Sequence, residues 1–348
     1  MDNILIVYRS HIDRAAPIIS IAQTLINSGY RVSWLSPHDQ SYDFNCGISI
    51  FYRPFRLKNN SFISKKINDF IWGIEVLKTM REFDRVYIVG ADTIISTFLS
   101  RFFNIKLYYH LRELHDKNFL YMFLLRIILP KNAKVIVPEI NRAHLYKHFL
   151  NLSSLPCVLP NMALKQSTIK QINKKYDLPN KFLLYQGSIH KERDLTNICH
   201  SILNLNLTLV CMGRDFGMLS VYKSILKERL IHINHISPPN HLLITRYALA
   251  GIAFYDKKSL NSVYCAPNKL WEYTSNGVPI ISSDNPSMIC DVKVNKIGII
   301  INEGDAIDDL TNKLQHLLKN RKDYSINCLE FYRHNILNYN KKINEIFI

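Results

Sequence analysis

Glycine is scarce in this sequence, with 11 among 348 residues, and none of them belongs to a G-x-G-x-x-G turn. The first strand-like run, residues 3–8, is followed by the loop RSHIDRAAP, which contains no glycine. Glycines in such a turn let the backbone approach a pyrophosphate. Their absence argues against NAD or FAD in the usual position of the first half.

Paired cysteines and long apolar runs are also missing. The seven cysteines form no C-x-x-C pair, and several lie in apolar runs such as LTLVCMG, so we expect buried, reduced thiols. The longest apolar stretch, 118–130, contains Arg126 and ends at Pro130, short of the roughly 20 residues that span a bilayer. The start of the chain lacks the pattern of a secretory signal. We therefore expect a cytoplasmic protein.

Negative charge is in deficit. Lys and Arg number 44 and Asp and Glu 28, so the formal net charge is +16. Such an excess suits an anionic partner, which could be nucleic acid, lipid or a phosphate-bearing ligand. The excess is spread over both halves and no nucleic-acid module is recognisable, so we expect no nucleic-acid partner.

Short apolar runs alternate with amphipathic segments along the whole chain. This alternation predicts an α/β fold with two mostly parallel sheets covered by helices, that is, two Rossmann-like domains. The expected strands are residues 3–8, 31–36, 48–53, 85–90, 106–110 and 134–138 in the first half and 181–187, 206–213, 230–235, 250–255, 278–283 and 296–302 in the second.

The periodicity fades between the two halves, around residues 151–181, where Pro156 and Pro160 stand close together. We therefore expect one domain over residues 1–160 and a second over 161–330. The tail from about residue 305 is helical in pattern, with a break near 320, and contains no Gly or Pro. We expect its last part, 331–348, to return to the first domain.

The segment PNKLWEYTSNGVPIIS, residues 267–282, predicts a short helix that leads into a buried strand. Pro267 suits the first helical turn, Gly277 the exit, and the free N–H groups near Asn268 could meet an anion. Lys269 and Glu272 share a helix face, and could serve a phosphate and two ribose hydroxyls. Spacing alone leaves open the alternative of a surface ion pair.

This segment resembles the nucleotide-binding helix and strand of GT-B glycosyltransferases, in which a P-x-K-x-x-E-Y-x-x-x-G-x-P-V-I pattern recurs. Two further stretches, LLYQGSIHKERDL and LVCMGRDFG, resemble the start of the donor-binding domain and the strand and turn under the donor base. The resemblance implies two domains facing each other across a cleft and a C-terminal helix crossing back. The donor-binding residues that it implies are Gly187, Ser188, Arg193, Gly213, Asn268, Lys269 and Glu272.

One position departs from the family pattern. Retaining members usually carry two glutamates separated by seven residues, and the position eight before Glu272 is Tyr264, with no acid nearby until Asp256. The usual contact of the first glutamate to the sugar or its diphosphate is therefore missing or replaced. Donor identity and the choice between retention and inversion stay open.

The loop after the expected strand 106–110 gathers several groups able to serve as a base. It holds His110, Glu113, His115 and Asp116 within seven residues. Similar loops line the active cleft in the resembled family, and we favour Glu113, then Asp116, as a base or sugar-contacting residue. Ordinary surface charge at a helix start is the alternative. The resemblance adds His110 to the cleft, and the first loop offers His11 and Arg14 to a polar ligand.

The resemblance implies a hexosyltransferase that uses a nucleotide-sugar, with UDP the commonest nucleotide in the family, and needs no cofactor. No D-x-D pair occurs and His110 and His115 lack metal-ligand spacing, so we expect metal independence. The implied acceptor is a saccharide or a polyprenyl-linked saccharide of a bacterial capsule, lipopolysaccharide or exopolysaccharide.

A basic amphipathic stretch, residues 55–80, could lie on an anionic membrane, so that the protein would attach peripherally to the inner face. A helix packed on its own sheet with a basic outer face explains the same pattern. Two other functions remain open: a nucleotide-sugar 2-epimerase, which shares the double-domain fold, and a non-catalytic glycan-assembly partner, which the missing first glutamate would suit.

Overall fold

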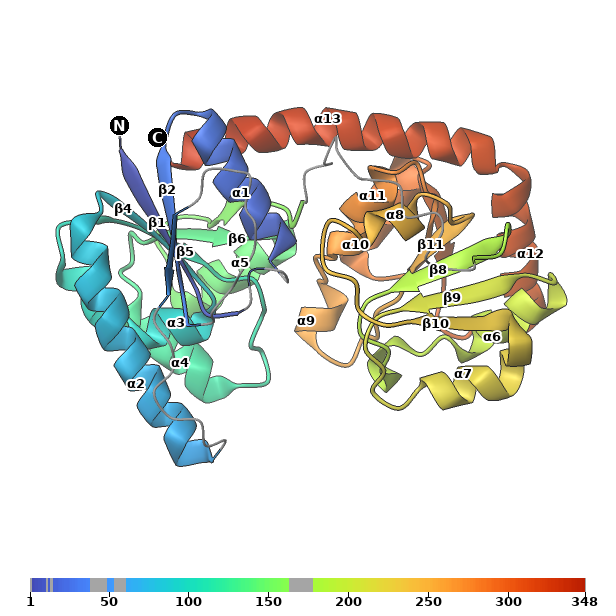
Figure 1. Cartoon of the computed structure of the whole chain (residues 1–348), viewed down its shortest axis with the longest axis horizontal. Coiled ribbons are helices and arrows are strands. Elements are labelled where there is room, and N and C mark those ends of the chain that lie inside the picture. The colour runs from blue at the N-terminus through green and yellow to red at the C-terminus, as the bar shows by residue number, and fades with distance from the viewer. Residues whose placement is uncertain are drawn as a thin grey trace. The chain divides into compact units, whose positions relative to one another are not determined.

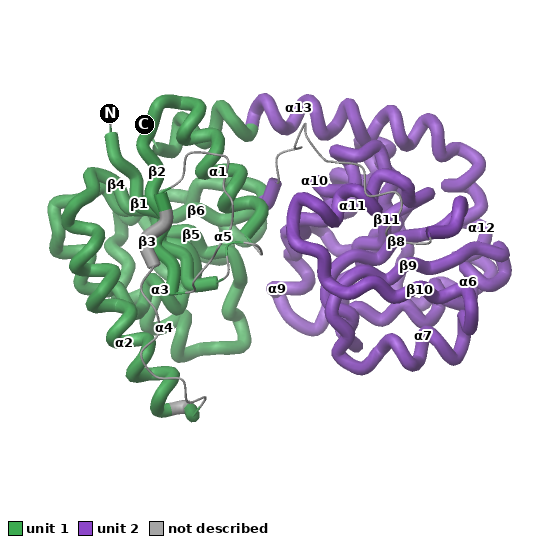
Figure 2. Tube along the Cα trace, viewed as in Figure 1, with its two compact units in different colours: residues 1–160, 339–348 green, residues 161–338 purple. Residues whose placement is uncertain are grey.

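The computed structural model describes residues 2–10, 12, 15–37, 49–52, 61–162 and 178–347. It divides the chain into two compact units (Figure 2). Unit 1 comprises Met1–Pro160 and Tyr339–Ile348, and unit 2 comprises Asn161–Asn338. Each unit has its own parallel sheet and its own core, so each is described by itself.

The sheet of unit 1 is seven-stranded and parallel, in the order β3-β2-β1-β4-β5-β6-β7. Its centre is buried on both faces, as near-continuous apolar runs predict. The strands are β1 (Asn3–Tyr8), β2 (Arg31–Ser36), β3 (Ser49–Tyr52), β4 (Arg85–Val89), β5 (Lys106–His110), β6 (Lys134–Val137) and β7 (Cys157–Val158).

Helices cover both faces of this sheet (Figure 1). One face carries α1 and the end of the last helix, which meet where Thr24 Oγ1 donates to Asn340. Right-handed crossovers place the other helices on the opposite face. The helical segments are α1 (Ala16–Asn27), α2 (Phe62–Thr79), η2 (Met80–Glu82), α3 (Ala91–Ser96), η3 (Phe98–Phe102), α4 (Phe119–Ile128) and α5 (Ile140–Leu150).

Unit 2 has a six-stranded parallel sheet in the order β10-β9-β8-β11-β12-β13. The strands are β8 (Phe182–Gln186), β9 (Thr208–Met212), β10 (Leu230–Ile233), β11 (Ala250–Ala253), β12 (Ile280–Ser283) and β13 (Gly298–Ile301). The helical segments are η4 (Lys191–Arg193), α6 (Thr196–Asn204), α7 (Leu219–Leu226), η5 (Lys227–Arg229), α8 (Leu242–Thr245), α9 (Leu260–Val263), α10 (Asn268–Thr274), α11 (Pro286–Val294), α12 (Ile307–Lys319) and α13 (Arg321–Phe347).

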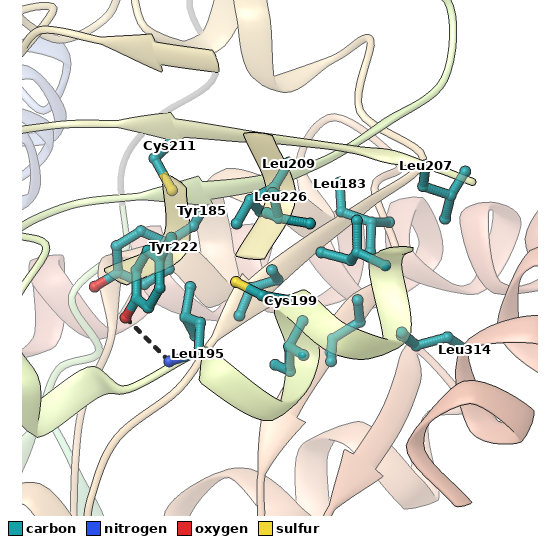
Figure 3. Packing of buried hydrophobic residues seen from close by; sticks show 14 of the residues in the cluster. Leu183, Tyr185, Leu195, Cys199, Leu207, Leu209, Cys211, Tyr222, Leu226 and Leu314 are labelled. Atoms are coloured by element: carbon teal, nitrogen blue, oxygen red, sulfur yellow. Dashed lines mark hydrogen bonds between the residues drawn. The ribbon is translucent and has the colours of Figure 1, made fainter. Parts of the chain in front are cut away.

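One layer of the unit 2 core lies between the sheet and helices α6, α7 and α12 (Figure 3). Apolar side chains such as Leu183, Leu209 and Leu314 are fully buried in it. The buried hydroxyl of Tyr222 accepts a hydrogen bond from the backbone N–H of Leu195 at 3.0 Å, so the polar atom of this ring is satisfied. This packing fixes the start of α6, directly after η4 and Arg193.

In each sheet the strand order reverses at one point. The reversal lies between β1 and β4 in unit 1 and between β8 and β11 in unit 2. Open α/β sheets bind ligands beyond the carboxyl ends of the strands at such a switch point. The residues that follow β8 and β11 are therefore the first place to look for a site in unit 2.

The sequence-based prediction of two Rossmann-like domains and a long C-terminal helix is confirmed. The short strand β7 was not predicted, because two residues between Pro156 and Pro160 give no periodic signal. Helix α13 is continuous from Arg321, and the part that belongs to unit 1 begins at Tyr339 rather than at residue 331. Its end packs there, with the Phe347 ring 4.5 Å from that of Tyr108, centroid to centroid.

The cysteines partly follow the prediction. Cys199, Cys211, Cys265 and Cys328 are buried free thiols, and burial raises the pKa of Cys199 and Cys328 to about 12. Cys157 is half-buried and Cys290 is exposed, contrary to the expectation of burial. Cys290 lies on α11, whose outer face is in contact with solvent.

Candidate nucleotide site in unit 2

The segment 267–282 forms a short helix, α10, followed by a buried strand, β12, as predicted. The position of Pro267 differs from the prediction. Pro267 has extended backbone, with ψ of 131°, and occupies the N-cap position rather than the first turn. The helix begins at Asn268 and ends at Thr274, and Gly277 follows with φ of +66° before the buried strand β12. The first turn of α10 therefore contains Asn268 and Lys269.

Lys269 is the most unusual residue of this helix. Its side chain is only 6% exposed, and its Nζ atom has no hydrogen-bond partner among the described residues. The ammonium lies 3.9 Å from the centroid of the Tyr185 ring and 5.7 Å from that of Tyr255. Burial, and then the nearby Arg193, hold the pKa of Lys269 well below its usual value. An anion beside Nζ would remove this penalty.

Arg193 supplies a second cation to the same place. Its guanidinium carbon lies 4.8 Å from the centroid of the Tyr255 ring, and it donates a hydrogen bond to the Tyr185 hydroxyl. The Tyr185 hydroxyl in turn donates a hydrogen bond to the backbone oxygen of Ser188 at 2.6 Å. Two cations thus stand on aromatic faces near the carboxyl ends of β8 and β11.

Gly187 and Gly213 make room beside these cations. Gly187 follows β8 with φ of +128°, and a Cβ built on it would lie 3.2 Å from Lys269 Cε and 3.6 Å from an Arg193 nitrogen. Gly213 follows β9 with φ of +148°, and a Cβ there would lie 2.1 Å from the Gly187 carbonyl oxygen. Both positions need glycine, because the two loops and the two cations converge on one small volume.

Glu272 points into a buried network and not toward Lys269. Gln186 donates to one oxygen of its carboxylate, and His241 Nε2 lies 3.3 Å from the other. Thr245 fixes Gln186 by donating to its amide oxygen at 2.8 Å. The sequence-based alternative of a surface ion pair between Lys269 and Glu272 is therefore wrong, since both are buried and the carboxylate has other partners.

The protonation state of Glu272 follows from these contacts. Burial acts to raise the pKa of its carboxyl, but His241 and the hydrogen bonds from His241 and Gln186 outweigh burial and place the pKa below its ordinary value. The group is a carboxylate at neutral pH. Two hydrogen bonds leave two of its roughly four acceptor positions unused.

Most residues that complete this site carried no signal in the sequence. Tyr185 and Gln186 stand inside an ordinary strand, and His241 and Tyr255 are separated from Lys269 in sequence. Their only signal was position, because Tyr185 and Tyr255 lie near the carboxyl ends of the two strands that flank the switch point. Asn268 and Ser188, which were predicted, are both half-buried at the edge of the site.

The missing glutamate is not replaced at its own position. Tyr264 follows the short helix α9 and is half-buried. Asp256, the nearest preceding acid in the sequence, lies three residues beyond Ala253, the last residue of β11. Its Oδ2 is buried without a hydrogen-bond partner in the described parts of the chain. The backbone N–H of Asp256 donates to the backbone oxygen of Glu192 at 3.1 Å, which attaches this loop to η4.

The residues predicted in unit 1 are only partly gathered by the structure. His110 ends β5 and is 1% exposed, and its Nδ1 hydrogen-bonds to the Tyr87 hydroxyl. Its Nε2 is buried and has no hydrogen-bond partner among the described residues. Burial, and then Arg112, lower the pKa of His110 well below its usual value, so its ring is neutral. Arg112 donates to the Tyr8 hydroxyl at 3.2 Å.

Glu113 and Asp116 lie in the loop between β5 and α4, as predicted. Glu113 is exposed and Asp116 half-buried. The loop is anchored by Tyr146 of α5, whose hydroxyl donates to the Glu113 backbone oxygen at 2.5 Å. The role predicted for each carboxylate stays a prediction. His11 and Arg14 lie outside the described residues.

Among the described residues, no group of three or more His, Cys, Asp or Glu side chains could hold a metal ion. Within the same residues, no helix has both the length and the apolar character that crossing a bilayer requires.

Comparison with known proteins identifies the fold. No family model and no curated protein matches the sequence. Among solved structures, HepE from Anabaena in complex with UDP-glucose superimposes with a TM-score of 0.75 at 14% identity, covering 99% of each chain. Sucrose-phosphate synthase from Thermosynechococcus elongatus gives 0.70 at 14% identity, covering 100% of this chain and 95% of the other.

A third structure, WaaG, a glycosyltransferase involved in lipopolysaccharide biosynthesis, gives a TM-score of 0.64 at 13% identity over 95% of each chain. Such neighbours are GT-B glycosyltransferases, and this chain has the fold that they share. At these identities the comparisons establish the fold alone.

Proposed function

We propose that this chain is a glycosyltransferase that moves a sugar from a nucleoside diphosphate donor, a UDP-sugar, to a saccharide or lipid-linked saccharide acceptor. The buried ammonium of Lys269, for which the described residues supply no hydrogen-bond acceptor, carries this proposal. A buried polar group without a partner is costly, and a bound anion is the simplest explanation for its retention. The diphosphate would lie against Lys269, Arg193 and the backbone of Gly187 and Ser188.

The same arrangement would assist bond cleavage. The negative charge on the diphosphate leaving group grows as the glycosidic bond breaks, and fixed cations stabilise it without reorganisation. Lys269 and Arg193 are held on the Tyr185 and Tyr255 rings before any ligand arrives. We propose on these grounds that transfer needs no metal ion and no other cofactor.

Glu272 would bind the ribose. Its carboxylate keeps unused acceptor positions, and Gln186 and His241 hold it in one orientation. Gly213 would lie under the base, since its close approach to Gly187 leaves no side chain in that place. Asn268 would add a polar contact from the first turn of α10.

For the acceptor reaction, Glu113 is the proposed base and Asp116 the second choice, with His110 beside them at the end of β5. We propose a role in bacterial surface-glycan synthesis, in the cytoplasm and with peripheral attachment to the inner face of the membrane. The UDP-glucose complex of HepE and the part of WaaG in lipopolysaccharide biosynthesis support the donor and the glycan role.

Isothermal titration with UDP, GDP, ADP and CMP, in the presence of a metal chelator, tests the donor site. We expect one nucleotide to bind, and Lys269→Ala and Glu272→Ala to weaken it, while Lys293→Ala, an exposed lysine on α11, leaves binding unchanged. A folded protein that binds none of the four would refute the proposal. Product analysis with the matching sugar nucleotide then separates transfer from epimerisation.

A further inference from the structure

Helix α4 is almost entirely apolar but is poorly buried. Its sequence is FLYMFLLRII, and only Leu125 is fully buried. Phe119 is 82% exposed, and Leu120, Phe123 and Ile127 are also exposed. A helix that is hydrophobic on all sides normally lies in a protein core or in a membrane. The exposure of α4 therefore indicates a missing apolar partner.

Helix α2 also exposes apolar side chains, on the face that does not pack on unit 1. Ile63, Ile67, Phe70 and Ile74 follow a spacing of four, three and four residues, so they form one stripe, and all are exposed. The helix packs on unit 1 through another face, which carries Trp72. The sequence-based alternative, a helix packed on its own sheet with a basic outer face, describes part of this arrangement, because Lys65 and Lys66 are exposed as well as the apolar stripe.

These two helices are both neighbours of α3. Helix α3 contacts α2 and α4 (Figure 1). A Cβ on Gly73 of α2 would lie 2.2 Å from the Ser96 backbone oxygen of α3, so the contact is close. Arg101 of η3 donates to the carbonyl oxygens of Ile127 and Ile128 at 3.0 Å each, which joins η3 to the end of α4. Phe102 of η3 is 73% exposed. We call α2, η3 and α4 with their exposed apolar side chains the apolar surface of unit 1.

The charge around this surface is positive. Residues 93–112 and 117–138 contain no Asp or Glu, and Lys117, Arg126 and Lys131 are exposed beside α4. On α2, Lys65 and Lys66 are exposed next to the apolar stripe. The acids of α2 are engaged: Asp69 pairs with Arg9, and Glu75 with Lys78.

We propose that the apolar surface of unit 1 docks onto an anionic lipid bilayer. Phe102, Phe119 and Phe70 would enter the boundary between headgroups and acyl chains, and Lys117 and Arg126 would meet lipid phosphates. A second copy of the chain fits less well, because pairing this surface with itself would oppose like charges. The inference rests on the membrane location in the proposed function, and it identifies the surface responsible.

The position of α4 connects this surface to the proposed chemistry. Loop 111–118 runs from the end of β5 to the first residue of α4 and carries Glu113 and Asp116. A docked α4 would therefore hold these carboxylates near the lipid surface. The acceptor class that suits this placement is a saccharide carried on a membrane lipid.

Co-sedimentation of the full-length protein with phosphatidylcholine vesicles, with and without phosphatidylglycerol, tests the proposal. We expect binding that requires phosphatidylglycerol, an at least tenfold loss for Phe102→Ser/Phe119→Ser, and a comparable loss for Lys117→Gln/Arg126→Gln. The matched control is Val294→Ser/Leu337→Ser, which changes two side chains that are each 72% exposed outside the apolar surface. It should bind as the unchanged protein does.

Failure to bind anionic vesicles, or equal loss in the control, would overturn the proposal. So would a dimer in analytical ultracentrifugation that Phe102→Ser/Phe119→Ser dissociates, because a second copy would then cover the surface. UDP titration of the same samples keeps the two proposals apart. A variant that binds UDP but no vesicles supports docking by this surface, whereas vesicle binding without UDP binding refutes the donor site alone.

Discussion

The two units reverse strand order in the same way, but the basic side chain near the switch point has different neighbours in each. In unit 1, Arg9 follows β1, pairs with Asp69 and lies 3.5 Å from Asp92. In unit 2, Lys269 lies beside Gly187 at the end of β8, and its Nζ has no hydrogen-bond partner in the described chain. Arg9 of unit 1 thus has acidic partners within its unit, whereas Lys269 of unit 2 has aromatic neighbours.

The difference shows that this fold does not by itself make an anion site. Both sheets end in loops that hold polar groups, and both reverse strand order. In unit 1, Asp69 and Asp92 lie beside Arg9. In unit 2, Lys269 and Arg193 stand against aromatic rings, and this contrast predicts that an anion binds in unit 2.

The largest expected effect is the difference in UDP binding between the variants Lys269→Ala and Arg9→Ala. Lys269→Ala should weaken UDP binding by roughly 100-fold, since two charge-assisted hydrogen bonds contribute about 3 kcal/mol together. Arg9→Ala should leave UDP binding unchanged and lower the free energy of unfolding, because Asp69 loses its partner. Titration calorimetry measures UDP affinity, and urea unfolding measures the free energy of unfolding. Equal loss of UDP binding in both variants would contradict the comparison.

The second effect concerns the glycines beside the two switch points. Gly213→Ala places a Cβ 2.1 Å from a backbone oxygen, whereas Gly90→Ala meets the movable side-chain oxygen of Asp92 at 2.8 Å. We expect Gly213→Ala to cost about 2–3 kcal/mol of unfolding free energy and Gly90→Ala about 1 kcal/mol. Denaturant unfolding of both variants checks the order. A larger loss at Gly90 would show that the close contact at Gly213 relaxes.

Glu272→Gln should have an intermediate effect. The amide keeps the shape but replaces one acceptor oxygen by a donor, so we expect roughly tenfold weaker UDP binding, about 1.4 kcal/mol. Because the pKa of Glu272 is depressed, its carboxylate stabilises the folded state above the ordinary carboxyl pKa and loses this effect as pH falls. The variant should lose that part of the acid dependence of unfolding. If the unfolding free energy of Glu272→Gln depended on pH as that of the unchanged protein does, Glu272 would not be the group responsible.

The smallest effect is a pH dependence of binding. Burial lowers the pKa of Lys269, and a bound diphosphate would raise it again. UDP binding should therefore take up a proton and weaken a few-fold as pH rises from the lowered pKa of Lys269 toward the ordinary pKa of a lysine. Without ligand, the lysine destabilises the fold below its unfolded pKa, so stability rises with pH through the same window.

Titration calorimetry in buffers of different ionisation enthalpy measures that proton uptake. Lys269→Arg provides the control, because a guanidinium stays charged over this range. Equal proton uptake in the variant would assign the effect to another group. His190 is the neighbour to test next, since burial and Arg193 lower its pKa as well.

Much of the fold could be predicted from the sequence. The strands of unit 2 appear at the predicted runs, and the break between α12 and α13 falls at Asn320 as expected near 320. Local signals carried these predictions, such as apolar runs for buried strands and Gly277 after α10. The two-residue strand β7 was missed because pairing with β6, rather than any pattern of its own, makes it a strand.

The candidate site was predicted less completely. The motif pointed to Lys269 and Glu272, and the structure places both at the expected edge, but it joins Glu272 to Gln186 and His241 instead of Lys269. Partners 86 and 31 residues away cannot be read from helix spacing. The apolar surface of unit 1 was seen only in part, since the sequence suggested α2 but gave no reason to expect exposure of α4.

The sequence by itself determined which segments become strands and helices, where one unit ends at Pro160, and which glycines and basic residues surround β8 and α10. Those outcomes depend on short-range periodicity and backbone preference. Only the tertiary structure decided that Arg9 has an acid beside it, and that the apolar side chains of α2 and α4 remain exposed. Burial and charge pairing depend on residues far apart in sequence, which meet only when the sheets form.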